Sequence, residues 1–315
     1  MPDLILKFLL GIVILLASTQ LFVKTAKKIS EAFKLSPLII GITVVAIGTS
    51  LPELAFSLMA LIKHDIGLAM GNIVGSNIVN ILLVFPVGIL VAKLRVGSTK
   101  TQRSAIFLLL ISGLFLTLQV ATKISSQIVG FFLISLALVI TLVEYFLGAS
   151  GRSGEDKKMF EKKSRVNITP AILVLPIFLI AGIIIGSYLA VNAVEGFSLI
   201  TGISTTVLGL SLTAVVTSLP ELMTTIFSQE EHQAKLTVGN ILGSNIYNLL
   251  LIGGIINLLA GRNGIPPKDW VIFGFVTVFF VLLLKKYSAK NIPRRFGLVL
   301  LVMFIFYIIS IAWKF

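Results

Sequence analysis

Two acidic residues occur in the same short sequence at two distant places in the chain. Glu53 lies in "TSLPEL" at 49–54, and Glu221 lies in an identical "TSLPEL" at 217–222. Both copies fall within long apolar stretches, where an acidic side chain costs about 3 kcal/mol even on scales measured for helix insertion. Because an ionisable residue inside a membrane usually faces an ion or another charge, we interpret the two glutamates as cation ligands.

Hydroxyl groups accompany each glutamate at helical spacing. Thr49 and Ser50 precede Glu53 by four and three residues, so their oxygens project from the face that carries its carboxylate. Thr217 and Ser218 repeat this arrangement before the second glutamate. We therefore expect each copy to offer a carboxylate together with two hydroxyls.

A proline next to each glutamate predicts additional oxygen ligands from the backbone. Proline has no N–H for the carbonyl four residues back, so Pro52 should free the carbonyl of Gly48, and Pro220 that of Val216. Unpaired carbonyls inside a membrane are tolerated where they line a cavity or meet a ligand, as in the broken helices of transporters. We expect a discontinuous helix at both places.

A second repeated motif follows the first, as "GNIVGSNIVNIL" at 71–82 and "GNILGSNIYNLL" at 239–250. Its polar residues are four apart and share one stripe of a helix, while its glycine pairs allow another helix to approach closely. A single Ser or Asn in a membrane helix more often bonds a neighbouring helix than an ion. The stripes are Asn72, Ser76 and Asn80, and Asn240, Ser244 and Asn248; the glycine pairs are Gly71 with Gly75 and Gly239 with Gly243.

The chemistry of these groups predicts the kind of ion. The cluster offers carboxylate, hydroxyl, amide and backbone oxygens, and the chain has no cysteine. Soft metals prefer His or Cys, whereas Ca2+ takes about six to eight oxygens in flexible geometry, and Mg2+ fits less well because it demands a rigid octahedron. Two carboxylates would balance one Ca2+.

Composition predicts the environment of these motifs. Of 315 residues 57% are hydrophobic and 12% charged, with a mean hydropathy of +1.05, whereas a soluble domain has roughly 25% charged residues. We expect an all-α integral membrane protein with ten transmembrane helices. The predicted spans lie near 4–23, 36–62, 66–91, 104–121, 126–148, 168–192, 203–228, 236–260, 269–284 and 296–313.

The chain contains an internal repeat. Residues 41–82 align without a gap on 209–250, and 19 of the 42 pairs are identical. Each half holds five predicted spans, an odd number, so the second half must enter the membrane from the opposite side. We therefore expect two inverted five-helix repeats, 1–148 and 168–315, joined by a linker at 149–167.

Basic residues predict the orientation. Of the 26 Lys and Arg, 20 fall in the connections that follow the odd-numbered spans. These connections, including the linker 149–167, should be cytoplasmic and both termini outside, in a cell membrane. Topology thus explains the net charge of +13 better than nucleic-acid binding does.

The pair "GITVVAIGTSLPEL" with "GNIVGSNIVNIL", and its copy "GLSLTAVVTSLPEL" with "GNILGSNIYNLL", resembles the two alpha-repeats of the Ca2+/cation antiporter superfamily. The most similar branch is the Na+/Ca2+ exchanger family, of prokaryotic type. The resemblance implies antiport of about three Na+ for one Ca2+ by alternating access, with the lipid bilayer as its surroundings and with neither a cofactor nor an obligate protein partner. The ligands it implies are Glu53 and Glu221 for Ca2+, with Thr49, Ser50, Thr217, Ser218, Ser76, Ser244 and the carbonyls of Ala46 and Ala214. The polar stripes add Asn80 and Asn248 as candidate ligands.

Several departures from the family pattern bear on the coupling ion. Val216 stands where the family usually has glycine, which makes the backbone stiffer there. Asn80 and Asn248 occupy a position where the K+-dependent branch carries an acid in the second repeat, so K+ co-transport is not expected. Ser76 and Ser244 replace a glutamate usual in the proton-coupled branch. An H+/Ca2+ antiporter remains the alternative.

Two other classes of protein are weaker interpretations of the same residues. A passive cation channel could use these oxygens, but channels usually form a pore from several subunits, whereas two halves around one site favour alternating access. A membrane enzyme would need a catalytic motif, and the chain has no HExxH and no GxSxG with a suitable His. The sequence therefore predicts a transporter rather than an enzyme.

Overall fold

The computed structural model describes residues 1–32, 46–92, 94–96, 99–120, 124–150, 170–230, 234–261 and 265–312. Over these ranges the chain is almost entirely helical, and its extended pairing is limited to one bridge between Arg95 and Asn291. The first half contains α1 (Pro2–Ala32), α3 (Ala46–Thr49), α4 (Leu51–Ile62), α5 (Ile66–Val79), the π-helical turn η2 (Asn80–Val84), α6 (Phe85–Val91), α7 (Thr99–Val120) and α8 (Ser126–Ser150). The second half contains α10 (Pro170–Thr201), α11 (Thr205–Leu208), η3 (Gly209–Thr213), α12 (Ala214–Thr217), α13 (Leu219–Glu230), α14 (Ala234–Tyr247), η4 (Asn248–Ile252), α15 (Gly253–Leu259), α16 (Pro267–Lys286) and α17 (Arg294–Ala312).

Nine of the ten predicted spans are found as helices long and apolar enough to cross a membrane, within the part of the chain that is described. The tenth prediction, 36–62, is represented by α3 and the shorter apolar helix α4, and its residues 36–45 lie outside the described ranges. The predicted all-α membrane fold is therefore confirmed.

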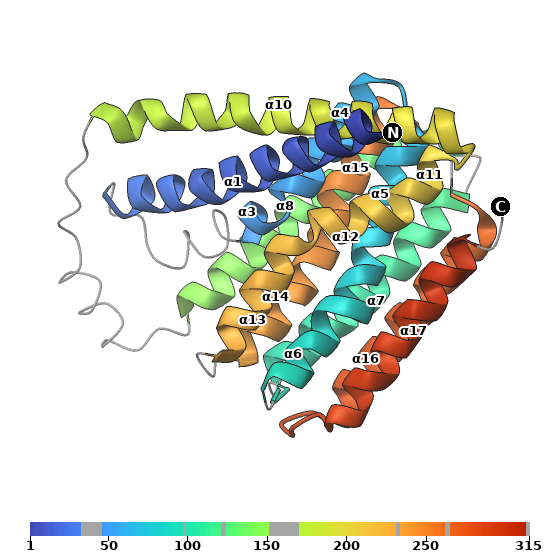
Figure 1. Cartoon of the computed structure of the whole chain (residues 1–315). Coiled ribbons are helices and arrows are strands. Elements are labelled where there is room, and N and C mark those ends of the chain that lie inside the picture. The colour runs from blue at the N-terminus through green and yellow to red at the C-terminus, as the bar shows by residue number, and fades with distance from the viewer. Residues whose placement is uncertain are drawn as a thin grey trace.

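The order of elements in the second half repeats that of the first. A long helix comes first, then a helix broken next to "TSLPEL", then a helix that contains a π turn, and finally two more helices. The two long helices, α1 and α10, lie side by side and run across the direction of the others (Figure 1).

Glycines bring α1 and α10 into backbone contact. A Cβ added to Gly11 would lie 2.7 Å from the amide nitrogen of Ala190, and one added to Gly186 would lie 2.5 Å from that of Leu15. Without side chains at these positions, the two helices approach until their backbones touch, as in small-residue contacts between membrane helices. The two long helices therefore form a closely packed pair.

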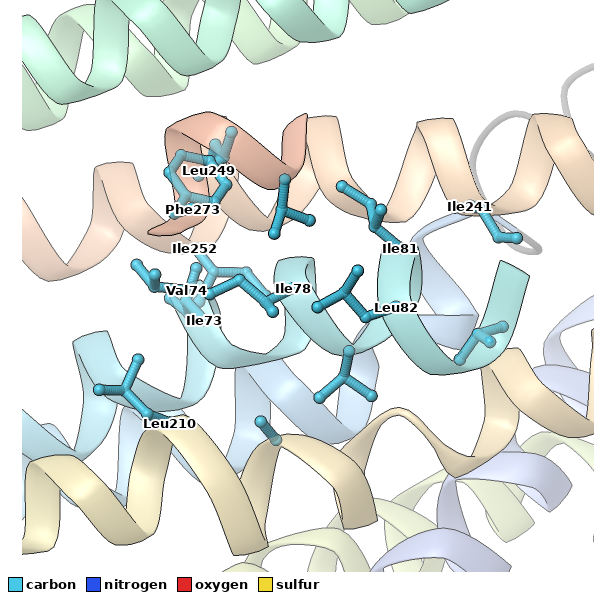
Figure 2. Packing of buried hydrophobic residues seen from close by; sticks show 14 of the residues in the cluster. Ile73, Val74, Ile78, Ile81, Leu82, Leu210, Ile241, Leu249, Ile252 and Phe273 are labelled. Carbon is cyan, nitrogen blue, oxygen red and sulfur yellow. The ribbon is translucent and has the colours of Figure 1, made fainter. Parts of the chain in front are cut away.

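The helix α5 lies at the centre of the remaining helices. Every residue of α5 from Leu68 to Val79 is buried. Ile73, Ile78 and their neighbours pack between Leu210 of η3 on one side and Leu249 of η4 on the other (Figure 2). Because protein surrounds α5, each polar side chain on it must find a partner inside the molecule or bear a cost.

Candidate cation site

The two glutamates occupy equivalent buried positions in the two halves. Glu53 lies in the first turn of α4 and Glu221 in the first turn of α13, and each is 0% exposed. The positive end of the helix dipole favours a carboxylate at this place. In each carboxylate the Oε2 atom is buried without a hydrogen-bond partner among the described residues. A bound cation would compensate these oxygens.

Each glutamate follows a break in its helix, as the prolines predicted. Ser50 separates α3 from α4 with φ −90° and ψ 9°, and Ser218 separates α12 from α13 with φ −80° and ψ 6°. Pro52 and Pro220 lie two residues later, in the first turn of the following helix. A proline there costs little, because the first turn needs no N–H for an intrahelical bond.

A serine hydroxyl donates to each of the two carboxylates. Ser218 Oγ donates to Glu53 Oε1 at 3.4 Å, across the two halves, whereas Ser244 Oγ donates to Glu221 Oε1 at 3.1 Å, within the second half. The hydroxyls of Ser76 and Thr217 lie 3.3 Å apart. The structure thus brings predicted residues of both halves into one buried cluster.

Two asparagines of the repeated stripes hold the threonines of the opposite half. Thr217 Oγ1 donates to Asn72 Oδ1 at 3.3 Å, and Thr49 Oγ1 donates to Asn240 Oδ1 at 3.5 Å. Asn72 also accepts from Thr213 at 2.9 Å. Thr213 was not predicted as a site residue, although its position four residues before Thr217 is a signal that could have found it.

The remaining predicted oxygens are the hydroxyl of Ser50 and the backbone carbonyls of Ala46 and Ala214. Ser50 Oγ is buried and has no hydrogen-bond partner in the described ranges. The carbonyl of Ala214 accepts the N–H of Ser218 at 3.1 Å, which leaves it one further lone pair for a ligand. Ala46 is the first residue of α3. All three residues lie at a helix break or four residues before one.

Asn80 and Asn248 begin two of the three π turns in the described ranges, η2 and η4, and both are 0% exposed. Asn80 Nδ2 donates to Asn245 Oδ1 at 3.0 Å, whereas neither polar side-chain atom of Asn248 has a hydrogen-bond partner among the described residues. The turn η2 contacts α13, which carries Glu221, and η4 contacts α4, which carries Glu53. Each asparagine therefore begins a turn packed against the opposite half's glutamate helix.

The first glycine pair of the second motif makes the close helix contact that the sequence predicted. A Cβ on Gly71 would lie 2.6 Å from the carbonyl of Thr206, and one on Gly75 would lie 2.6 Å from that of Leu210, which confirms the predicted close approach for the first pair. Around Gly239 and Gly243 no described atom lies within 4 Å of the corresponding position. Among the described residues, the predicted close approach is therefore seen for the first glycine pair.

The unusual Val216 does not change the conformation of the break. The backbone angles at Ser50 and Ser218 are nearly the same. In the first half a Cβ on Gly48 would lie 2.5 Å from Val23 Cγ2, so packing against α1 requires glycine there. Val216 is only half-buried and packs at the edge of the core. The stiffer backbone predicted at Val216 is therefore compatible with an equivalent break.

The fold and this cluster define a helical membrane protein with a buried, oxygen-lined site suited to a hard cation. The Sodium/calcium exchanger protein family matches residues 4–147 and 171–313. The chain therefore belongs to this family, which consists of transporters rather than enzymes.

Individual relatives agree over nearly the whole length. The chain is 30% identical to the Inner membrane protein YrbG of Escherichia coli, over 97% of this chain and 95% of that protein. It is 29% identical to the Sodium/calcium exchanger MaX1 of Methanosarcina acetivorans, over 97% of both chains. Its structure is similar to that of the sodium-calcium exchanger NCX_Mj soaked with 10 mM Na+ and 10 mM Sr2+, with a TM-score of 0.65, 28% identity and 99% of both chains covered.

Proposed function

We propose that this protein exchanges Na+ for Ca2+ across the cell membrane by alternating access. The observation that carries the proposal is the pair of buried carboxylates, Glu53 and Glu221, each with an oxygen that no described residue bonds. A relative named as a sodium/calcium exchanger and a similar structure of an exchanger soaked with Na+ and Sr2+ support the choice of ions.

The proposed ligands divide by charge. Glu53 and Glu221 supply the two negative charges, and within the described part of the chain no third acidic, His or Cys residue completes a metal cluster with them. The other ligands must then be neutral oxygens. They are the hydroxyl or carbonyl oxygens of Thr49, Ser50, Thr217 and Ser218, the hydroxyls of Ser76 and Ser244 as flanking Na+ ligands, the carbonyls of Ala46 and Ala214, and the amide oxygens of Asn80 and Asn248.

Charge balance sets the expected stoichiometry. One Ca2+ neutralises two carboxylates, whereas about three Na+ in the same cluster would leave one positive charge in excess. Because the two loaded forms differ in charge, the exchange cycle should move charge across the membrane. Ca2+ uptake in exchange for internal Na+ exports one net positive charge, so an inside-positive potential should accelerate it.

Alternating access follows from the proposed organisation of the chain. The halves 1–148 and 168–315 would be inverted repeats around the site, with the linker 149–167 cytoplasmic and both termini outside. Broken helices that meet at the interface of inverted repeats are a recurrent way for secondary transporters to hold ions. No cofactor or protein partner enters this scheme, only the ions and the lipid bilayer.

The test is Ca2+ uptake into vesicles that contain the purified protein. An outward Na+ gradient should drive uptake, whereas an outward H+ gradient without Na+ should not, and K+ added to Na+ should change little. The same vesicles, with K+ and valinomycin to set an inside-positive potential, should take up Ca2+ faster. Protein-free vesicles are the control. Equal uptake with the proton gradient alone would show that H+ rather than Na+ is the coupling ion. Uptake that needs no counter-ion would indicate a channel.

A further inference from the structure

We propose that Asn245, which is not among the expected ion ligands, is a positioning residue that fixes the orientation of the Asn80 amide. It holds the N–H2 group of Asn80 and so leaves the Asn80 oxygen as the atom available to the ion. This inference rests on the proposed role of Asn80 as a ligand. It assigns to the asparagine in the second copy of "GSN" (243–245) a function that differs from that of the residues around it.

The orientation follows from a chain of two hydrogen bonds that starts at a backbone carbonyl. The carbonyl of Asn77 can only accept, and Asn245 Nδ2 donates to it at 3.3 Å. Asn245 must then present its oxygen on its other side, where it accepts from Asn80 Nδ2 at 3.0 Å. Asn77, Asn80 and Asn245 are all 0% exposed, so water does not compete for these bonds. The carbonyl therefore determines which atom of Asn80 faces Asn245.

The consequence is a buried acceptor with fixed polarity. Asn80 Oδ1 has no hydrogen-bond partner in the described part of the chain, although an unpaired buried oxygen is costly. The turn that begins at Asn80 packs against α13, whose first turn carries Glu221. A reversed amide would instead offer N–H groups, which repel a cation. The two bonds thus prepare an oxygen ligand before the ion arrives.

The equivalent residues of the other half do not form this chain of bonds. Asn77, the repeat counterpart of Asn245, donates to the carbonyl of Ile73 in its own helix at 2.8 Å. Asn248, the counterpart of Asn80, has no partner for either side-chain atom among the described residues. Of the two repeat-related asparagines, Asn80 is held in one orientation and Asn248 is not. The site should therefore depend on Asn245 more than on its counterpart.

The experiment is a double-mutant cycle on Ca2+ uptake by the full-length protein in vesicles. Asn245→Leu and Asn80→Ala should each raise the KM for Ca2+ by about tenfold, the effect expected for one buried hydrogen bond or ligand oxygen, with little change in the maximal rate. Because Asn245 acts through Asn80, the double variant should be no worse than Asn80→Ala alone. Asn257→Leu is the matched control, since Asn257 is equally buried but donates within its own helix to Gly253 at 2.7 Å.

The outcomes separate this inference from the proposed function. Multiplied effects in the double variant, or an unchanged KM in Asn245→Leu while Asn80→Ala is impaired, would overturn the role of Asn245 and leave Asn80 as a ligand. An unchanged KM in Asn80→Ala, with uptake lost in Glu53→Gln, would overturn the inference but not the exchanger. If Asn245→Leu does not fold, Asn245→Ala and the Ca2+-induced rise in Tm of the detergent-solubilised protein make the same comparison.

Discussion

The two glutamates share a sequence motif but not the same surroundings. Glu53 accepts from Ser218 of the opposite half at 3.4 Å, whereas Glu221 accepts from Ser244 of its own half at 3.1 Å. Ser76, the repeat counterpart of Ser244, lies instead 3.3 Å from Thr217. The site is therefore asymmetric at the level of single hydrogen bonds, although the repeated sequence suggests symmetry.

Replacing either glutamate by glutamine tests the charge of the site. Glu53→Gln or Glu221→Gln keeps the size of the side chain and one oxygen but removes one of two charges in a buried cluster. The loss of Ca2+ binding should be several kcal/mol, on the order of 3, so Ca2+ uptake should nearly vanish in both variants. Initial rates of Na+-driven Ca2+ uptake provide the measurement.

Ser76→Ala and Ser244→Ala are the matched controls for the charge. Each removes only a neutral hydroxyl, which contributes about 1 kcal/mol, so exchange should persist with a weaker dependence on Na+. If both glutamine variants carried Ca2+ at the unmodified rate, the carboxylates would be structural and the proposed site would be wrong.

The sequence predicted residue types at the site better than it predicted their partners. The identical "TSLPEL" copies point to both glutamates and their hydroxyls, because a carboxylate within an apolar stretch needs an explanation. The contact of Thr217 with Asn72 joins residues of different halves. No spacing along one helix reports such a pair. Thr213 donates to the same asparagine, and only its spacing of four residues before Thr217 could have pointed to it.

At the level of elements, the prolines predicted the breaks and hydropathy predicted the spans, but the π turns were not expected. The stripe that ends at Asn80 was interpreted with the ordinary helical period, whereas η2 begins at that residue, and η4 begins at Asn248. A π turn inserts an additional residue into a helix and has no strong sequence signal of its own. The register of the stripe therefore changes at its last residue.

A glycine substitution tests how closely η3 must approach α5. In Gly75→Val the new Cβ would lie 2.6 Å from the carbonyl of Leu210 and 2.7 Å from Ala214 Cβ. Because a backbone carbonyl cannot move aside easily, the variant should lose about 1–3 kcal/mol of unfolding free energy. It should also displace the break that follows Ala214 and slow Ca2+ uptake. Thermal unfolding in detergent and uptake rates measure the two effects.

Gly113→Val in α7 controls for the change of side chain itself. No described atom lies within 4 Å of a Cβ at Gly113, so valine there should leave both the unfolding temperature and the uptake nearly unchanged. Equal losses in the two variants would show that the contact between η3 and α5 has no special importance.

At the scale of the whole molecule, hydropathy predicted where the chain crosses the membrane but not which helices pack together. The pairing of α1 with α10 depends on Gly11 and Gly186, whose helices are more than a hundred residues apart. The first long helix of the second half was also predicted to end near 192, before Glu195. In the structure α10 continues to Thr201, and Lys63 Nζ pairs with Glu195 at 2.8 Å.

The orientation of the two halves can be tested with single cysteines, because the natural chain has none. Ser125, before α8, and Lys290, before α17, are exposed residues in the connections that precede the last helix of each half. In inverted repeats these equivalent connections lie on opposite sides of the membrane. Ser125→Cys should therefore react with a membrane-impermeant maleimide on intact cells, and Lys290→Cys only after permeabilisation. A permeant maleimide that labels both confirms that each cysteine is accessible, and labelling of both by the impermeant reagent would contradict the inverted arrangement.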